Sequence, residues 1–128
     1  MKLNLDCMRC ILLNLEDLPF RETISSDQLH DVISDYSPDE IDYAILKMYE
    51  AGLVNANIEN YLDGTIDIEI FDISYNGHQF LANIRENKIW SATKSVMGKV
   101  GSTSVTAAAQ IATGVVTELI KQTIFPLV

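Results

Sequence analysis

Residues 37–81 decide the fold, and they read SPDEIDYAILKMYEAGLVNANIENYLDGTIDIEIFDISYNGHQFL. The stretch begins with the signature of a helix start. Ser37 suits the N-cap, Pro38 suits the first helical position, and Glu40 completes a capping box. A stripe of apolar residues at helical spacing follows and ends at Gly52, which readily adopts the left-handed backbone found after many helices. This part of the chain therefore predicts one well-bounded helix.

Two segments in which apolar and polar residues alternate come next, and they flank Asp63-Gly64. The alternation runs through residues 54–58 and again through 66–70, and it is the period of a strand with one buried face. Asp-Gly between two such segments indicates a tight turn with positive φ. The chain therefore predicts a β-hairpin here.

Helical periodicity and capping residues predict the remaining elements. In chain order they are a helix over 5–17 ended by Pro19, an extended piece over 21–24, a short helix capped by Ser26, the helix over 38–51, and a helix from Ser74 that continues through Trp90 and breaks near Gly98 and Gly101. The expected buried residues of the helices are Leu5, Met8, Ile11, Leu12, Leu15, Leu29, Val32, Ile33, Ile41, Ala44, Ile45, Met48, Phe80, Leu81 and Ile84.

A helix, a hairpin and a helix in that order form the second half of a winged-helix domain. The sequence therefore predicts an α+β fold, namely a winged helix over residues 1–97 with a three-helix core, a β-hairpin wing and a fourth helix. A C-terminal helix over 102–125 is expected to extend this domain, and Pro126 closes the chain.

The C-terminal helix carries apolar or small residues at alternating spacings of four and three, namely Val105, Ala109, Ala112, Val116 and Leu119. Such spacing is typical of a seam along which one helix packs on another. We therefore expect this helix to hold the protein in a homo-oligomer or to bind a partner protein. The alternatives are a helix that completes the core of its own chain and one that contacts a membrane. Its polar residues argue against a membrane span.

The formal net charge of −9 at pH 7 is distributed unevenly along the 128 residues. Residues 1–78 hold four basic and sixteen acidic side chains, a charge of −12, whereas residues 79–128 hold five basic and two acidic ones, a charge of +3. An acidic body disfavours non-specific binding to nucleic acid. The candidate nucleic-acid contacts are the basic residues of the distal part: Arg85, Lys88, Lys94 and Lys99.

The surface that a winged helix normally turns toward DNA is acidic in this sequence. Helical geometry places Asp39, Asp42, Tyr43, Leu46, Lys47 and Glu50 on the exposed side of the helix over 38–51, so three acids stand against one lysine. The hairpin adds Glu59, Asp63 and Asp67 and no lysine or arginine. Such a surface repels a phosphate backbone, and the usual docking on DNA is therefore disfavoured.

Cys7 and Cys10 are the most obvious candidates for chemistry, and they lie one helical turn apart. A zinc site needs four ligands, and the only other soft candidates, His30 and His78, lack paired spacing. A redox dithiol would require a strand before the first cysteine, whereas both cysteines fall within a predicted helix. No nucleophile or carboxylate stands at a recognisable spacing from His78. We therefore expect structural cysteines, no metal, no cofactor and no enzyme activity.

Six motifs resemble those of the small YjcQ-like proteins. They are Met8-Arg9-Cys10-Ile11-Leu12-Leu13, Tyr43-Ala44-Ile45-Leu46, Ala51-Gly52-Leu53-Val54, Ile73-Ser74-Tyr75-Asn76-Gly77-His78-Gln79-Phe80-Leu81, Ile84-Arg85 and Ile89-Trp90-Ser91-Ala92-Thr93-Lys94. The YjcQ-like proteins belong with a group of domain-of-unknown-function proteins common in prophages of Gram-positive bacteria. The resemblance covers residues 6–96, implies a winged-helix fold and a mobile-element origin, and brings no catalytic residues. Extra helical sequence over 27–34 departs from the usual pattern of that group.

The leading hypothesis is a non-enzymatic phage or prophage protein that acts through protein contacts or as an accessory regulator. The alternative is a dimeric, sequence-specific DNA-binding transcriptional repressor of the same fold, and a third hypothesis is a small enzyme or redox protein that uses Cys7 and Cys10. More basic residues on the helix over 38–51 would favour the repressor, and Lys47 is the only one. Asp6 and Arg9 interrupt the apolar start of the chain, so we expect no signal peptide and a cytoplasmic protein.

Overall fold

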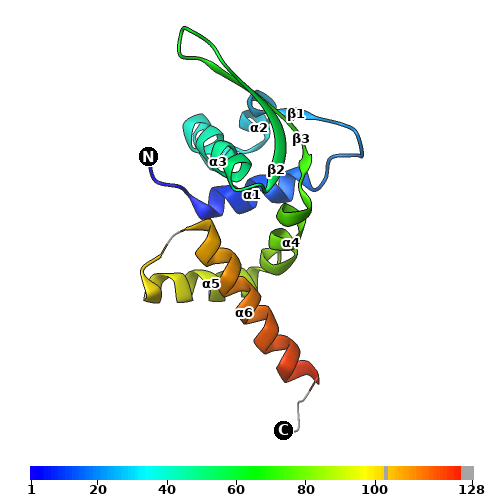
Figure 1. Cartoon of the computed structure of the whole chain (residues 1–128), viewed down its shortest axis with the longest axis vertical. Helices are drawn as coiled ribbons and strands as arrows, with labels where there is room; N and C mark the ends of the chain where they lie inside the picture. Colours follow the sequence, from blue (N-terminus) through cyan, green and yellow to red (C-terminus); the bar gives the residue numbers. More distant parts are fainter. Residues whose placement is uncertain (103, 125–128) are drawn as a thin grey trace. The chain divides into compact units, whose positions relative to one another are not determined.

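The computed structural model describes residues 1–102 and 104–124, and within them the chain is a mixed α+β protein with six helices and a three-stranded antiparallel sheet (Figure 1). The elements are α1 (Leu5–Leu15), β1 (Ile24–Ser25), α2 (Ser26–Val32), α3 (Pro38–Glu50), β2 (Val54–Asn60), β3 (Ile66–Ile73), α4 (Tyr75–Ile84), α5 (Asn87–Val100) and α6 (Val105–Ile124). The predicted α+β class is confirmed.

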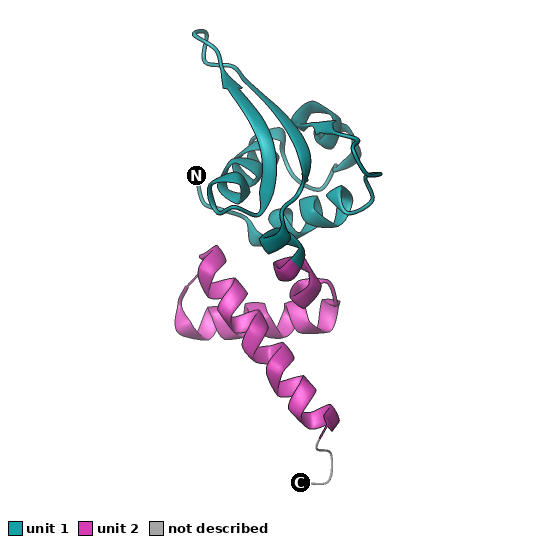
Figure 2. Cartoon of the chain, turned by 45° about the vertical axis from the view of Figure 1, so that its right-hand side comes forward, with its two compact units in different colours: residues 1–78 teal, residues 79–128 magenta. Residues whose placement is uncertain are grey.

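The chain divides into two compact units, Met1–His78 and Gln79–Val128, called unit 1 and unit 2 below (Figure 2). The division falls inside α4, whereas the sequence predicts domains over 1–97 and 102–125. Residue 125 and Pro126, the predicted end of the last helix, lie outside the described residues.

The helices α1 and α3 form much of the core of unit 1. The residues of α1 that face inward are Cys7, Met8, Ile11, Leu12 and Leu15, and those of α3 are Ile41, Ala44, Ile45 and Met48. The buried residues of α3 are the predicted ones, so the buried face expected for this helix is confirmed. The helix α1 ends two residues before its predicted end, because Glu16 is already its C-cap.

The predicted capping box of α3 is present and is tied to the start of α1. The Glu40 backbone N–H donates to Ser37 Oγ at 3.2 Å, and the Ser37 N–H donates to Glu40 Oε1 at 3.3 Å. Asn4, the N-cap of α1, donates from Nδ2 to Glu40 Oε2 at 3.1 Å. These bonds lower the pKa of Glu40, chiefly through the Asn4 amide.

Two details predicted for α2 are wrong. Its N-cap is Ser25 rather than Ser26, because a capping box needs Glu or Gln three residues on, and Gln28 stands at that distance from Ser25. Val32 is 62% exposed, whereas Leu29 and Ile33 are buried. The helix ends at Val32, and Ile33 is already extended, so the helical stripe does not continue.

The sheet has the order β1-β3-β2, so β3 is central and β2 is an edge strand. The extended piece predicted before α2 is the two-residue strand β1, which pairs with β3 at Ile24 and Ser25. In the hairpin, Ile58 lies opposite Ile68, and a bulge interrupts the register between Asn55 and Ala56.

The hairpin turn is longer than the two-residue turn that Asp-Gly suggests. The Tyr61 N–H donates to the Thr65 carbonyl at 2.9 Å, and the Gly64 N–H donates to the Tyr61 carbonyl at 3.0 Å. Gly64 has φ +88°, whereas Asp63 is not among the residues with positive φ. This pattern is a three-residue loop in which Gly64 supplies the single left-handed position.

The entry to α4 depends on close packing at Gly77. Ser74 accepts from the Gly77 N–H at 3.0 Å and donates to the Gly52 carbonyl, so it joins the start of α4 to the end of α3. A Cβ at Gly77 would clash with the Leu53 carbonyl oxygen and lie 2.6 Å from Ile73 Cγ2. Only glycine therefore fits at this position.

In unit 2, the predicted continuation of α4 through Trp90 is wrong. The helix α4 ends at Ile84, and α5 begins at Asn87 after the extended N-cap Glu86. A continuous helix would place polar residues 87 and 88 on the apolar stripe that ends at Ile84. Because a new helix begins at Asn87, the buried face resumes with a different set of positions, and Trp90, Thr93 and Met97 of α5 are buried.

The helix α5 ends at Val100, and its C-cap Gly101, one of the two glycines at which the sequence predicts a break, has φ +73°. Gly98 lies within α5 and causes no break. The helix α6 follows and packs against α5, with Ala108 and Ala112 as its buried residues.

Candidate functional site

A groove of about 500 Å³ lies between α3 and the edge strand β2, and we call it the α3–β2 groove. Its apolar lining comes from Tyr43, Leu46 and Tyr49 of α3 and from Ala56, Ile58 and Ile66 of the hairpin. Most of these side chains are half-buried, and Tyr49 is 46% exposed. The polar residues Lys47, Glu50, Asn57 and Asn60 complete the lining, so the groove combines an accessible apolar part with a polar rim beside the strand edge.

Lys47, the one basic residue that lines the groove, contacts Glu50 and Tyr43. Lys47 Nζ lies 2.8 Å from Glu50 Oε2 and 5.3 Å from the centre of the Tyr43 ring. The hydrogen bond to Glu50 raises the pKa of Lys47. Lys47 is also the only lysine or arginine in the sequence between Arg21 and Arg85.

The outer face of the hairpin is acidic. Tyr61 donates its hydroxyl proton toward Asp67 at 2.7 Å and lies 3.0 Å from Glu59, and the hydrogen bonds to these two carboxylates raise the pKa of Tyr61 to about 12. Glu59 and Asp67 are paired across the two strands, so like charges face each other there. Both side chains favour a positively charged neighbour.

The predicted exposed side of α3 is only partly exposed. Asp39 and Glu50 are exposed, whereas the other four residues predicted there are half-buried: Asp42, Tyr43, Leu46 and Lys47. Asp42 differs most from the expectation, because its Oδ1 lies 2.6 Å from His30 Nε2 of α2. The α2–α3 contact therefore uses His30, which periodicity alone does not reveal.

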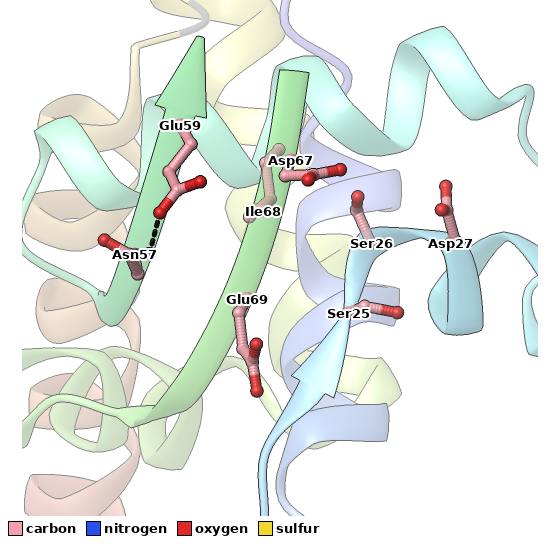
Figure 3. A pocket seen from close by; sticks show the side chains of 8 residues that line it. All are labelled: Ser25, Ser26, Asp27, Asn57, Glu59, Asp67, Ile68 and Glu69. Carbon is pink, nitrogen blue, oxygen red and sulfur yellow. Dashed lines mark hydrogen bonds between the residues drawn. The ribbon is translucent and has the colours of Figure 1, made fainter. Parts of the chain in front are cut away.

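A second hollow, of about 300 Å³, lies beside the start of α2 (Figure 3). It is lined by eight residues, Ser25, Ser26, Asp27, Asn57, Glu59, Asp67, Ile68 and Glu69. In Figure 3 the carboxylates of Glu59, Asp67 and Glu69 lie apart along the strands, that of Asp27 lies on α2, and they do not converge on one point. Among the described residues no group of three or more His, Cys, Asp or Glu is arranged to hold a metal ion.

The two cysteines are free thiols in α1. Cys7 is fully buried, and burial raises its pKa to about 12, with smaller contributions from Glu40 and Cys10. Burial also raises the pKa of Cys10, and the negative charge of Asp35 raises it further by a smaller amount. Both groups are therefore thiols at neutral pH, which disfavours nucleophilic or redox chemistry.

The four basic candidates of unit 2 are all exposed. Arg85 lies in the connection between α4 and α5, and Lys88, Lys94 and Lys99 lie on α5. At about 100° per residue, Lys94 points about 120° away from Lys88 and about 140° away from Lys99. Lys94 Nζ instead lies 5.8 Å from the centre of the Trp90 ring. The helix thus does not align its three lysines in one row.

The predicted seam of α6 is divided between two environments. Ala112 is buried, Val105, Ala109 and Val116 are half-buried, and Leu119 is 40% exposed. Toward the end of α6, Val116, Leu119, Ile120 and Ile124 line an apolar hollow with Ile89 of α5. Ala108, which the spacing argument omits, is also buried.

None of the helices formed by residues 1–102 and 104–124 has the length and apolarity that a bilayer crossing requires.

Comparison with known families shows the family to which the chain belongs. Residues 2–104 match the family described as Hypothetical protein (DUF2513), and the protein therefore belongs to that family. The matched region runs from before α1 through α5 and stops just before α6. No curated protein and no solved structure matches the chain.

Proposed function

We propose that this DUF2513 protein is a non-enzymatic winged-helix protein that acts by binding other proteins, either directly or as an accessory regulator. The order α1-β1-α2-α3-β2-β3 and the sheet order β1-β3-β2 support the winged-helix assignment. In such an arrangement α3 corresponds to the recognition helix and the β2–β3 hairpin to the wing.

The acidity of the α3 and hairpin surface carries this proposal. A helix that enters the major groove and a wing that contacts phosphate need lysine and arginine. Here Lys47 forms an ion pair with Glu50, and the hairpin carries Glu59, Asp63 and Asp67. The same surface suits a protein partner, because it combines carboxylates with an apolar groove.

Self-association through α6 is a second part of the proposal. The exposed apolar side chains Leu119, Ile120 and Ile124 favour a helix partner, and a second copy of the chain would supply one. We also propose a mobile-element origin, which rests on the sequence resemblance to the YjcQ-like proteins.

The alternative is a dimeric DNA-binding repressor. The charge of +3 on residues 79–128 favours it, because Arg85, Lys88, Lys94 and Lys99 are exposed there. DNA would then be contacted by unit 2 and not by α3.

Affinity purification of the tagged chain from its native host distinguishes the two functions. We expect a protein to co-purify and to be retained after nuclease treatment. A matched pair of variants tests the surface: Tyr49→Ala with Glu50→Lys changes the groove, and Tyr75→Ala with Glu22→Lys makes the same chemical change on exposed residues outside it.

The partner should be lost from the groove variant and kept by the control. Recovery of specific DNA instead, lost when the four basic residues of unit 2 are changed to alanine, would contradict the proposal and support the repressor.

A further inference from the structure

The edge strand β2 has one free side. Within residues 1–102 and 104–124, the sheet order β1-β3-β2 leaves β2 paired with β3 alone. Tyr61 and Thr65 form the hydrogen-bonded pair that closes the hairpin, so the pairs alternate from there along the ladder. Asn57 and Glu59 therefore direct their backbone groups to β3, whereas Ala56, Ile58 and Asn60 direct theirs outward.

The outward backbone groups have no other backbone partner in the described part of the chain. No hydrogen bond outside the ladder involves the backbone of Ala56, Ile58 or Asn60 within residues 1–102 and 104–124. An edge of this kind is a template for an added strand unless charges, proline or a bulge protect it. The bulge of β2 lies at Asn55 and Ala56, before this stretch, and Glu59 is its only charged residue.

Side chains on the two faces of β2 differ in chemistry. Ile58 and Ala56 face the apolar α3–β2 groove together with Leu46. Glu59, on the opposite face, is paired with Asp67. An added strand would alternate in the same way, with one set of side chains in the groove and the other beside these carboxylates.

We propose that β2 binds an extended segment of a partner protein in which apolar and basic residues alternate. The apolar side chains enter the α3–β2 groove, the basic ones lie beside Glu59 and Asp67, and the backbone of the segment pairs with Ala56, Ile58 and Asn60. This inference rests on the proposed function and specifies the segment of the partner that is recognised.

Charge selects this occupant over a second copy of the chain. Two copies paired edge to edge through β2 would bring together two acidic faces, each with Glu59 and Asp67. Like charges placed opposite each other across a strand pair are unfavourable. A basic segment removes that repulsion and gains the attraction instead.

Nuclear magnetic resonance with synthetic peptides on the full chain tests the proposal. The probe is a capped peptide of alternating lysine and valine. One control has the same composition with the lysines and valines in separate blocks, and the other replaces lysine with glutamate. We expect the alternating basic peptide to bind in the micromolar to millimolar range and the controls to bind at least about tenfold more weakly.

Hydrogen exchange of the backbone amides supplies the geometric readout. Binding should slow exchange at Ala56, Ile58 and Asn60, and it should leave Asn57 and Glu59, already bonded to β3, nearly unchanged. Protection of residues in unit 2, protection without this alternation, or no binding at millimolar peptide would overturn the proposal.

Two variants test the strand register of the bound segment and the role of the carboxylate of Glu59. Asn60→Pro removes an outward N–H without breaking a bond to β3, so it should abolish binding while the hairpin resonances persist. Glu59→Lys should weaken binding by roughly tenfold, and Glu22→Lys, which makes the same change of net charge away from the sheet, should not. Equal effects of the two lysine variants would show attraction by overall charge alone and contradict the site.

The outcomes also separate this inference from the proposed function. A protein partner recovered from the host whose binding survives Asn60→Pro would leave the function standing and refute strand addition at β2. Recovery of DNA in place of protein would refute the function itself.

Discussion

Gly77 shows how one residue can determine the join between two elements. It lies in the first turns of α4, where its missing side chain lets the helix approach the Leu53 carbonyl. In the motif Gly77-His78-Gln79-Phe80-Leu81, the first position must be glycine because no side chain fits there. Phe80 and Leu81 are apolar because their side chains are buried. His78 is exposed, and the motif needs no catalytic role for it.

Replacement of Gly77 by alanine should destabilise the protein by about 2–3 kcal/mol, because the new methyl group meets a backbone oxygen that cannot move away easily. Gly98→Ala is the matched control, since nothing lies within 4 Å of a Cβ at that helical position. The control should raise stability by about 0.5–1 kcal/mol. Urea unfolding of both variants measures the difference, and equal stabilities would contradict the close approach.

The thiols of Cys7 and Cys10 should be nearly inert in the native protein. Their raised pKa values keep the reactive thiolate scarce at neutral pH, and Cys7 is also inaccessible. We expect a colorimetric thiol reagent at pH 8 to label Cys7 only after denaturation and Cys10 slowly before it. Cys7→Ala with Cys10→Ala should remain folded, with a loss of about 1–2 kcal/mol from the buried site. Stoichiometric zinc by elemental analysis would contradict this view of the cysteines.

At the scale of elements, capping residues connect segments that are distant in the sequence. Glu40 closes the capping box of α3 and also accepts from Asn4, the N-cap of α1. The starts of both helices therefore share one carboxylate. The charge of Glu40 is also favourable at a helix N-terminus.

This carboxylate should contribute a pH-dependent part of the stability. Because the folded-state pKa of Glu40 lies below its ordinary value of 4.5, the contribution is present above pH 4.5 and is lost as the pH falls through the folded pKa. Glu40→Gln should therefore lower the melting temperature at pH 7 by more than it does near pH 3. Glu22→Gln, on an exposed residue outside the helices, is the control and should show no such difference. An equal loss at both pH values would contradict the assignment.

At the scale of the whole molecule, charge separates the two units. Residues 1–78 carry −12 and residues 79–128 carry +3. Phosphate binding requires lysine and arginine that release counterions, and unit 1 offers few of them. The acidic unit dominates the net charge of −9.

The isolated protein should not bind random duplex DNA appreciably at physiological salt. Fluorescence anisotropy with a labelled generic duplex measures this directly. Micromolar binding that weakens steeply with added salt would show that the basic residues of unit 2 suffice, and it would favour the repressor.

Self-association is also a property of the whole molecule. If α6 pairs with a second copy, Val116→Asp with Leu119→Asp should convert the oligomer to a monomer, because an unpaired charge in an apolar interface is costly. Thr106→Asp with Gln110→Asp, on exposed residues of the same helix, is the control. Light scattering on the three proteins decides the matter, and a monomeric wild type at high micromolar concentration would refute the assembly.

The sequence alone determined the features that depend on neighbours along the chain. The capping box at Ser37, the buried face of α3 and the hairpin around Gly64 are local, since spacing and backbone preference specify them. Only the tertiary structure decided what depends on segments distant in sequence. The contact of His30 with Asp42, the close approach that excludes a side chain at Gly77 and the free edge of β2 each arise from how elements pack, which periodicity does not encode.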